Sequence, residues 1–134
     1  MTGWREERDR AVAARARALE EQRAAESRRA RQQISDFLKR ALAAGLATEP
    51  LRCRSYDGRA SYRTPLNGWY LNQARTVAVD TDGEFYTLTV PRSLAARVKG
   101  VRPQPQAPPL IVGEGGRDGE SMPLRDLLDK RLAA

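Results

Sequence analysis

The sequence contains no histidine and a single cysteine, Cys53, among its 134 residues. Without histidine the chain cannot build a histidine-based triad, a zinc site with imidazole ligands or a histidine proton shuttle. One cysteine forms neither an internal disulfide nor a cysteine-rich metal cluster, and as a nucleophile it would lack an imidazole base. Catalysis would rest on carboxylates, hydroxyls, lysine and arginine. We therefore expect a protein without enzymatic activity, bound metal or cofactor.

Long apolar runs are also absent. No stretch approaches the roughly 20 apolar residues that cross a bilayer. Residues 1–10 are rich in charge and lack the apolar stretch of about 7–15 residues that marks a secretory signal. We expect a cytoplasmic protein with no membrane partner.

Lysine is scarce, because 21 of the 24 cationic residues are arginine, and the net charge is +7. Arginine binds carboxylate and phosphate groups with two hydrogen bonds, so the bias favours anionic partners. A GC-rich coding sequence would produce the same bias without a functional cause. Residues 1–46 carry a charge of +4, residues 47–100 carry +3, and residues 101–134 are neutral.

Glycine and proline are missing from a long N-terminal stretch. No glycine occurs between Trp4 and Ala44, and no proline precedes Pro50. Alanine, arginine, glutamate and glutamine dominate there and favour a helix, so residues 4–46 are predicted to form one long helix or two abutting ones that stop at Gly45. From Ala30 onward, apolar residues at helical spacing predict a stripe that packs on the body: Ala30, Ile34, Phe37, Leu38, Ala41, Leu42 and Gly45.

The first half of this helix has no such stripe. Val12 and Leu19 are seven residues apart, but the next heptad positions are Glu26 and Gln33, so a coiled-coil seam is not sustained. We predict that residues 1–29 form a charged, solvated helical extension. The alternative is that it becomes ordered on a protein partner or in a weak oligomer, through residues 4–46. Charge pairs at helical spacing would support the helix weakly: Glu6–Arg10, Arg17–Glu21, Glu20–Arg23 and Glu26–Arg29.

The first of two predicted hairpins turns at Asp57-Gly58, a dipeptide typical of tight turns between strands. Pairing outward from this turn sets Arg52 opposite Arg63 and Arg54 opposite Ser61, with an apolar set on the other face. Guanidinium groups bind phosphate oxygens, and a neighbouring tyrosine ring can stack on a base. The basic face is therefore a candidate nucleic-acid or anion-binding site, formed by Arg52, Arg54, Tyr56, Arg59 and Arg63.

The second predicted hairpin turns at Asp82-Gly83. Pairing outward puts Val77, Val79, Tyr86, Leu88 and Val90 on one face and Ala78 with Phe85 on the other. Residues 69–71 are expected to form a third strand that turns at Asn72-Gln73, so that Tyr70 joins the valine face and Trp69 and Leu71 join Phe85. The segment from Asp80 to Glu84 begins like a calcium loop, but Pro91 stands where the loop needs its last carboxylate.

The C-terminal third predicts shorter elements. Ser93 to Lys99 should form a helix capped by Ser93 and ended by Gly100. A proline-rich, extended connector follows at residues 101–109, and residues 110–112 could add an edge strand. Residues 113–119 read as a glycine-rich turn, before a final helix capped by Ser121.

Together these elements predict an α+β protein: a long N-terminal helix packed on a small antiparallel β-meander, with a short C-terminal helix. Residues 30–134 would form a single domain, with the C-terminal segment on the sheet face opposite the long helix. The leading functional hypothesis is a non-catalytic protein–protein interaction or assembly module that uses its charged N-terminal helix. The alternative is nucleic-acid or polyanion binding through the hairpin face. The expected core is Ile34, Phe37, Leu38, Leu42, Val77, Val79, Tyr86, Leu88, Leu127 and Leu128.

Overall fold

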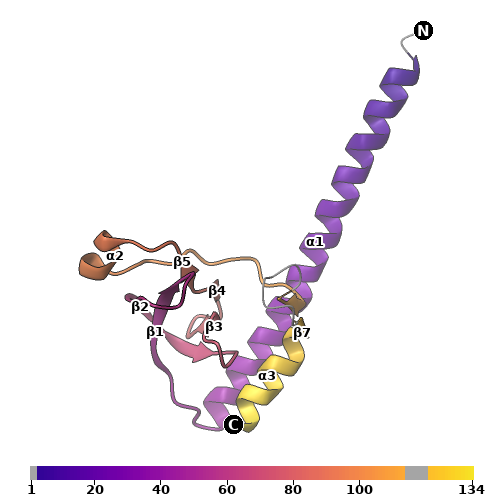
Figure 1. The fold of residues 1–134 in the computed structure, drawn as a ribbon. Coiled ribbons are helices and arrows are strands. Elements are labelled where there is room, and N and C mark those ends of the chain that lie inside the picture. Colours follow the sequence, from indigo (N-terminus) through magenta and orange to yellow (C-terminus); the bar gives the residue numbers. More distant parts are fainter. Residues whose placement is uncertain (1–2, 114–120) are drawn as a thin grey trace.

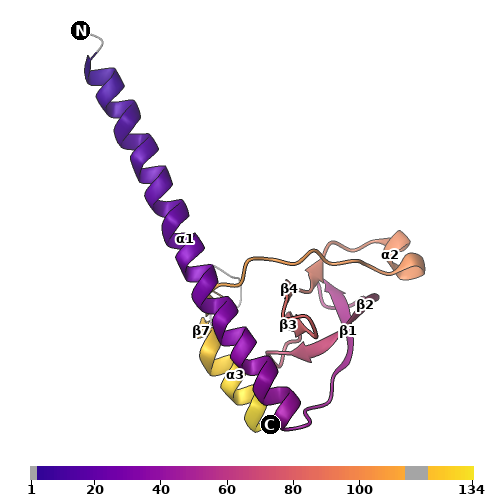
Figure 2. The same cartoon turned by 180° about the vertical axis from the view of Figure 1, so that it is seen from behind.

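A computed structural model describes residues 3–113 and 121–134, and its elements confirm the α+β architecture. A long helix stands beside a small curved sheet, and its N-terminal half projects clear of the body (Figures 1 and 2). Residues 114–120, which include most of the glycine-rich turn predicted at residues 113–119, lie outside the described residues. The elements are α1 (Gly3–Ala43), β1 (Glu49–Ser55), β2 (Ser61–Tyr70), β3 (Val77–Asp80), β4 (Phe85–Thr87), β5 (Thr89–Val90), α2 (Leu94–Lys99), β6 (Ile111–Val112), β7 (Met122–Pro123) and α3 (Leu124–Ala133).

The N-terminal segment is one continuous helix that ends where Gly45 predicts. Gly45 has φ +67°, a left-handed conformation that glycine adopts without steric penalty. Its N–H donates to the carbonyl of Leu42, and the N–H of Leu46 donates to that of Ala41. These two bonds form a Schellman motif, which satisfies carbonyls that the end of the helix leaves free.

The apolar stripe of α1 is narrower than predicted. Ala30, Ile34, Phe37 and Ala41 are buried, and Leu38 packs partly buried against them. The prediction of Leu42 as a core residue is wrong, because 75% of its surface is exposed. Leu42 lies about 100° around the helix from Ala41 and therefore points away from the sheet.

The sheet curls until its two edges meet. Its strand order is β4-β3-β2-β1-β5, with antiparallel neighbours except that β5 runs parallel to β1. Only Leu88 separates β4 from β5, and its N–H donates to the carbonyl of Thr76 while its carbonyl accepts from the N–H of Arg54. The chain from Phe85 to Val90 thus pairs with β3 in its first part and with β1 in its second. The antiparallel meander is confirmed for β1 to β4, and the parallel β5 is the departure from it.

The first hairpin has the predicted register. Arg52 pairs with Arg63, Cys53 with Tyr62 and Arg54 with Ser61. Cys53 and Tyr62 are buried, whereas the three arginines are exposed.

The predicted register of the second hairpin is wrong by one residue. Val79 pairs with Phe85 rather than with Tyr86, because the loop has three residues, 81–83, and closes through a bond from the N–H of Asp80 to the carbonyl of Glu84. Gly83 has φ +85°, as the last position of such a loop requires. A one-residue slip exchanges the two faces.

The predicted third strand is the end of β2, and its turn runs through residues 72–76. The side-chain oxygen of Asn72 accepts from the N–H groups of Thr76 and Val77, so Tyr70 pairs with Ala78. Tyr70 therefore does not join the valine face. Together the two registers place Trp69, Leu71, Val77, Val79 and Phe85 on the outside of the curl and Tyr70, Ala78, Tyr86 and Leu88 on the inside.

Two hydrophobic clusters follow from this curvature. The first lies between the outer face of the sheet and helices α1 and α3, where the rings of Phe37 and Trp69 meet edge to face at 5.5 Å. The C-terminal helix α3 belongs to this cluster through Leu124, Leu127 and Leu128, so the expectation that it covers the opposite face is wrong. The second cluster lies inside the curl and is covered by α2 and the start of the connector: Leu51, Cys53, Tyr62, Ala78, Tyr86, Leu88 and Ala96, with Val101 partly buried.

The connecting segments follow the prediction in part. Ser93 caps α2 by accepting a bond from the N–H of Ala96, and Gly100 ends the helix with φ +78°. Ser121 does not cap α3, whose N-cap position is Pro123. Residues 111–112 pair with β7 in a separate two-stranded sheet, not at an edge of the main sheet. Within the described residues, none of the helices is both long and apolar enough to cross a membrane.

The contact between Phe37 and Trp69 yields a stability prediction. Replacing Phe37 by Ala should lower the free energy of unfolding by about 3–5 kcal/mol, because a buried aromatic ring is lost from a packed cluster. The Leu42→Ala control should change it by less than about 0.5 kcal/mol, since Leu42 is exposed. Urea unfolding monitored by circular dichroism measures both, and equal losses would contradict the packing described here.

Candidate functional site

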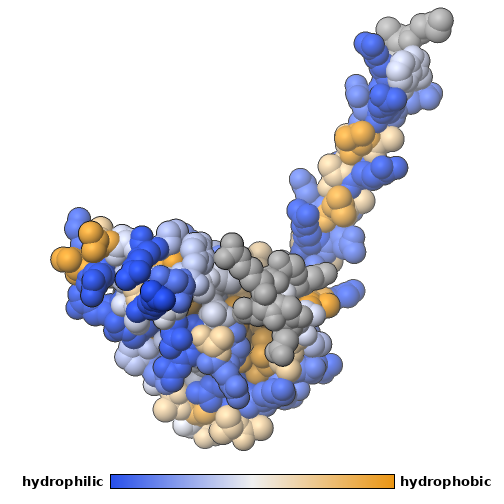
Figure 3. Space-filling view, viewed as in Figure 1, coloured by the Kyte–Doolittle hydropathy of each residue, from blue (hydrophilic) through white to orange (hydrophobic). Residues whose placement is uncertain are grey.

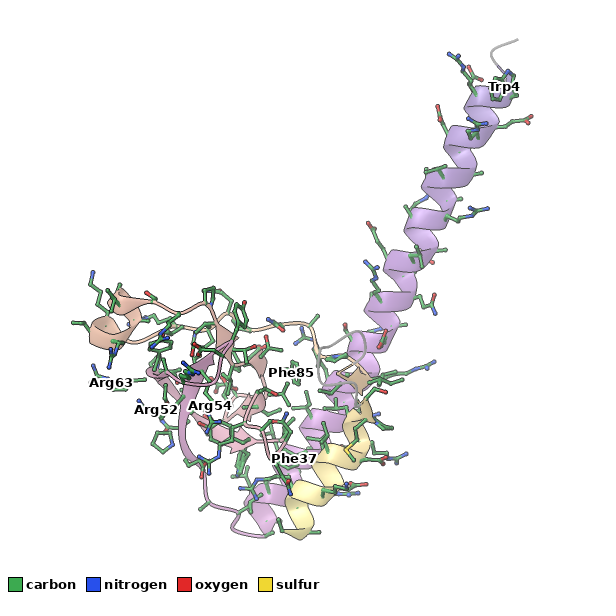
Figure 4. The ribbon with its side chains drawn as sticks, in the orientation of Figure 1. Trp4, Phe37, Arg52, Arg54, Arg63 and Phe85 are labelled. Carbon is green, nitrogen blue, oxygen red and sulfur yellow. The ribbon has the colours of Figure 1, made fainter. Side chains whose placement is uncertain are left out.

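Three arginines of the predicted basic face lie together on the first hairpin. Arg52 and Arg63 sit directly opposite each other on β1 and β2, and Arg54 follows two residues along β1 (Figure 4). Arg52 is held in place because its Nε donates to Oγ of Ser61 at 2.8 Å. These three arginines therefore present a cationic surface to solvent.

Tyr56 and Arg59 belong to the loop between the two strands. Asp57 organises this loop, because its carboxylate accepts from the hydroxyl of Ser55, from the N–H of Arg59 and from Nη1 of Arg92. The bond from Ser55, then the bond from Arg59, lowers the pKa of Asp57 below its ordinary value. Tyr56 lines a groove that none of the four predicted arginines lines.

Helix α2 and its flanks extend the cationic surface, and sequence reasoning missed this. Nη2 of Arg63 donates to the carbonyl of Val98 at 3.1 Å, and the N–H of Val101 donates to the carbonyl of Arg63 at 2.7 Å. The hairpin and the α2 segment therefore form one unit, which we call the basic tip and define as residues 51–64 and 91–102. It contains eight exposed cations: Arg52, Arg54, Arg59, Arg63, Arg92, Arg97, Lys99 and Arg102.

The basic tip accounts for the entire net charge of the protein. Its eight cations stand against a single acid, Asp57, whereas the remaining residues hold sixteen cations and sixteen acids. Asp57 is already paired with Arg92 at 3.3 Å. The charge of +7 is therefore a local property of one end of the molecule.

The outermost residues of the basic tip are apolar. Leu94 and Val98 are 80% and 75% exposed, whereas Ala96 between them faces the body and is 9% exposed. The pair forms a hydrophobic patch over α2, surrounded by polar residues in the space-filling view (Figure 3). The four-residue spacing of Leu94 and Val98 was visible in the sequence, but such a pair is ordinarily the buried face of a helix.

The second candidate surface is the N-terminal part of α1, residues 3–24, which we call the arm. Every one of these 22 residues is exposed, including Trp4, Val12 and Leu19 at 54%, 61% and 53%. The guanidinium groups of Arg5 and Arg8 lie over the ring of Trp4, at 5.9 and 5.0 Å from its centre.

Ion pairs contribute little to the arm. Of the four predicted charge pairs, all within the described residues, only Glu6–Arg10 lies within 4 Å, at 3.6 Å. Glu26, just beyond the arm, instead accepts a hydrogen bond from the N–H of Leu110.

Two potentially reactive side chains, the carboxylate of Asp80 and the thiol of Cys53, have structural roles. Oδ1 of Asp80 accepts from the N–H groups of Asp82 and Glu84, and Oδ2 accepts from the hydroxyl of Tyr86 at 2.9 Å, so this carboxylate shapes the turn. Burial raises the pKa of the Cys53 thiol, which disfavours a nucleophilic thiolate. Among the described residues, no group of three or more acids and cysteine is placed to hold a metal ion.

The groove beside Tyr56 has no converging acids. It runs along the outer strands and the connector, past Tyr70, Arg75, Phe85 and Lys130, and Glu49 is the single acid among the described residues that line it. Paired carboxylates for general acid–base chemistry are therefore not brought together there.

Comparison with known proteins adds no family to this picture: no family model, curated protein or solved structure matches the chain significantly. Its function has to be inferred from its own residues.

The bond between Tyr86 and Asp80 yields a pH prediction. Desolvation, and then the bond to Asp80, raises the pKa of Tyr86 from 10.0 to about 12. The unfolded chain loses this proton near pH 10, while the folded protein keeps it until about pH 12, so the stabilisation is complete below pH 10 and is lost between these values.

The test compares the wild type with Tyr86→Phe. The variant should be less stable at neutral pH by about 1–3 kcal/mol, because Oδ2 of Asp80 loses its buried donor. The difference between the two proteins should shrink as the pH rises from 10 to 12, as measured by urea unfolding. A constant difference across this range would contradict the raised pKa.

Proposed function

We propose that the protein is a non-catalytic interaction module whose arm binds a protein partner. The observation that supports the proposal is that all residues 3–24 are exposed. The apolar side chains of this segment lie on the same side of α1 as the residues that pack against the body.

The geometry of α1 shows this continuity. Val12 precedes Ala30 by 18 residues, and Leu19 precedes Phe37 by 18 residues. At 3.6 residues per turn, a spacing of about 18 residues is five full turns, so each pair lies on the same side of the helix. Ala30 and Phe37 are buried against the sheet and α3, whereas Val12 and Leu19 face solvent. A partner that covers the arm on this side would extend an existing packing surface.

A partner would also stabilise the arm. A solvated helical segment of this length, about 33 Å, gains little from its sparse ion pairs, and most helical stability in proteins comes from packing an apolar face. Burying Val12 and Leu19 would supply that packing at about 25 cal/mol for each Å² of apolar surface removed from water. The alternating charges beside this face would select among partners more than they would tighten binding.

The test places a photoreactive benzoylphenylalanine at position 12 or 19 of the full chain, with position 14, on a different side of the helix, as the control. We expect one discrete cross-linked protein, or a cross-linked dimer of the chain, from positions 12 and 19 but not from 14. Val12→Ser with Leu19→Ser should abolish the cross-link captured from a third arm position, whereas Ala14→Ser with Ala24→Ser should leave it unchanged.

Light scattering and helicity complete this test. If the arm orders on a partner or in an oligomer, the helical content of the purified chain should rise with concentration or on addition of the cross-linked protein. A strict monomer whose residues 4–28 are already rigid, with no cross-link from positions 12 or 19, would contradict the proposal.

A second candidate function, polyanion binding through the basic tip, is favoured by one observation. Eight exposed cations and one acid, already paired, occupy residues 51–64 and 91–102. The guanidinium groups of arginines on neighbouring strands can each donate two hydrogen bonds to a phosphate, carboxylate or sulfate group. Binding of this kind releases counterions and weakens steeply as salt is raised.

The salt dependence tests this second function. A labelled oligonucleotide or heparin should bind the wild type at about 50 mM salt and dissociate as salt increases. Changing Arg52, Arg54, Arg59 and Arg63 to Gln should reduce the slope of log affinity against log salt by up to about 0.9 for each lost duplex phosphate contact. The control changes four arm arginines, Arg10, Arg15, Arg17 and Arg23, to Gln with the same loss of charge. Equal effects of the two variants, or no binding by the wild type, would contradict a site at the tip.

A further inference from the structure

The apolar patch on α2 has no role in the fold. Leu94 and Val98 are four residues apart on the solvent side of the helix, and both are more than 70% exposed, so they stabilise little of the body. The helix is held instead by Ala96, by the Ser93 cap and by a bond from the N–H of Ser93 to the hydroxyl of Tyr62 at 3.0 Å. Two aliphatic side chains kept at the far point of a well-anchored helix indicate a contact with something outside the molecule.

Cations surround this patch. Arg97 and Lys99 lie on α2 itself, Arg92 and Arg102 flank it in the chain, and Arg63 reaches its C-terminal end through the bond to the carbonyl of Val98. The residue segment 91–102 contains no acid. The occupant that this surface complements is therefore anionic at its surface and apolar just beneath it.

We propose that the basic tip docks on an anionic lipid surface, with Leu94 and Val98 entering the headgroup layer and the surrounding cations against the lipid phosphates and carboxylates. The proposal rests on the polyanion binding proposed above and names the polyanion. Such peripheral docking combines buried apolar area with electrostatic attraction and needs no membrane-spanning segment. It departs from the expectation of no membrane partner, which the absence of long apolar runs had motivated.

The shape of the tip favours lipid over a nucleic acid or a protein. Helix α2 protrudes from the body in both ribbon views (Figures 1 and 2), and none of residues 91–102 lines the groove beside Tyr56 or the small hollow between α1 and α3. A nucleic-acid backbone would neutralise the cations but leave both aliphatic side chains in water. A protein partner would need a matching acidic pocket, whereas a lipid layer yields to a convex surface.

The experiment mixes the full chain with vesicles and separates bound from free protein by sedimentation. Vesicles of phosphatidylcholine alone are compared with vesicles that also contain about 30 mol% phosphatidylserine. We expect binding to the anionic vesicles only, weakened by salt. Arg97→Gln with Lys99→Gln should lower the partition coefficient about 25-fold, at about fivefold for each cation near the surface. Leu94→Ser with Val98→Ser should lower it by at least about tenfold.

A matched control separates insertion from general hydrophobicity. Leu42 is as exposed as Val98, at 75%, but lies at the C-terminal end of α1, so Leu42→Ser should leave vesicle binding unchanged. An environment-sensitive nitrobenzoxadiazole probe on Val98→Cys should shift to the blue on anionic vesicles, and the same probe on Leu42→Cys should not. Native Cys53 is fully buried and will not compete for the label. Circular dichroism confirms that each variant is folded.

The outcomes distinguish this inference from the function on which it rests. Binding to an oligonucleotide or heparin without binding to anionic vesicles would leave polyanion binding standing and overturn the lipid surface. Vesicle binding that is unchanged in the Leu94→Ser, Val98→Ser variant, or equal for both lipid compositions, would also overturn it. If the protein binds neither oligonucleotide, heparin nor anionic vesicles, both proposals are wrong.

Discussion

The arrangement of the molecule depends on the contacts of the Trp69 indole with α1. Its ring packs edge to face against the ring of Phe37 from α1, with 5.5 Å between the ring centres. Its N–H donates to the carbonyl of Leu46, just beyond the end of the same helix. One side chain of the sheet thus holds both the face and the end of α1. Because α1 is a single straight element, fixing residues 30–46 also fixes the direction in which the arm leaves the body. The direction of the arm is therefore set without any contact between the arm and the body.

The closure of the sheet plays the same part for the other end of the molecule. The N–H of Leu88 donates to the carbonyl of Thr76, just before β3, and its carbonyl accepts from the N–H of Arg54 in β1. The strand after the second hairpin therefore reaches the far edge of the sheet. The chain then emerges beside Tyr62, whose hydroxyl accepts from the N–H of Ser93. This route places α2 next to the basic hairpin, although about 30 residues separate them in sequence. The cationic surface is therefore a product of topology rather than of any local run of charge.

Periodicity in the sequence predicted the regular elements, but it failed where a single side-chain hydrogen bond or the packing of a short helix decides the structure. Helical spacing was enough to find the buried stripe at Ile34 and Phe37, and alternation was enough to pair Arg52 with Arg63. The predicted register of the second hairpin was wrong by one residue, because the carboxylate of Asp80 accepts hydrogen bonds from two N–H groups of the loop. No periodicity records that bond. In the candidate site the four hairpin arginines were predicted, but the cations and aliphatic residues of α2 were missed. A helix of six residues has too few positions to show which side faces inward.

The proline-rich connector joins the two exposed surfaces. It starts at Val101, whose N–H donates to the carbonyl of Arg63 in the basic tip, and continues through Gln106, whose N–H donates to the carbonyl of Phe85. It leads into Leu110, whose N–H donates to the carboxylate of Glu26 at the base of the arm. Four prolines between residues 103 and 109 favour an extended backbone, and the hydrogen bonds at its two ends and at Gln106 fix its path across the sheet. The basic tip and the arm lie at opposite ends of this connector (Figure 1). A partner on the arm and an anionic surface at the tip would therefore not compete for space, and the body between them would set the distance between the two.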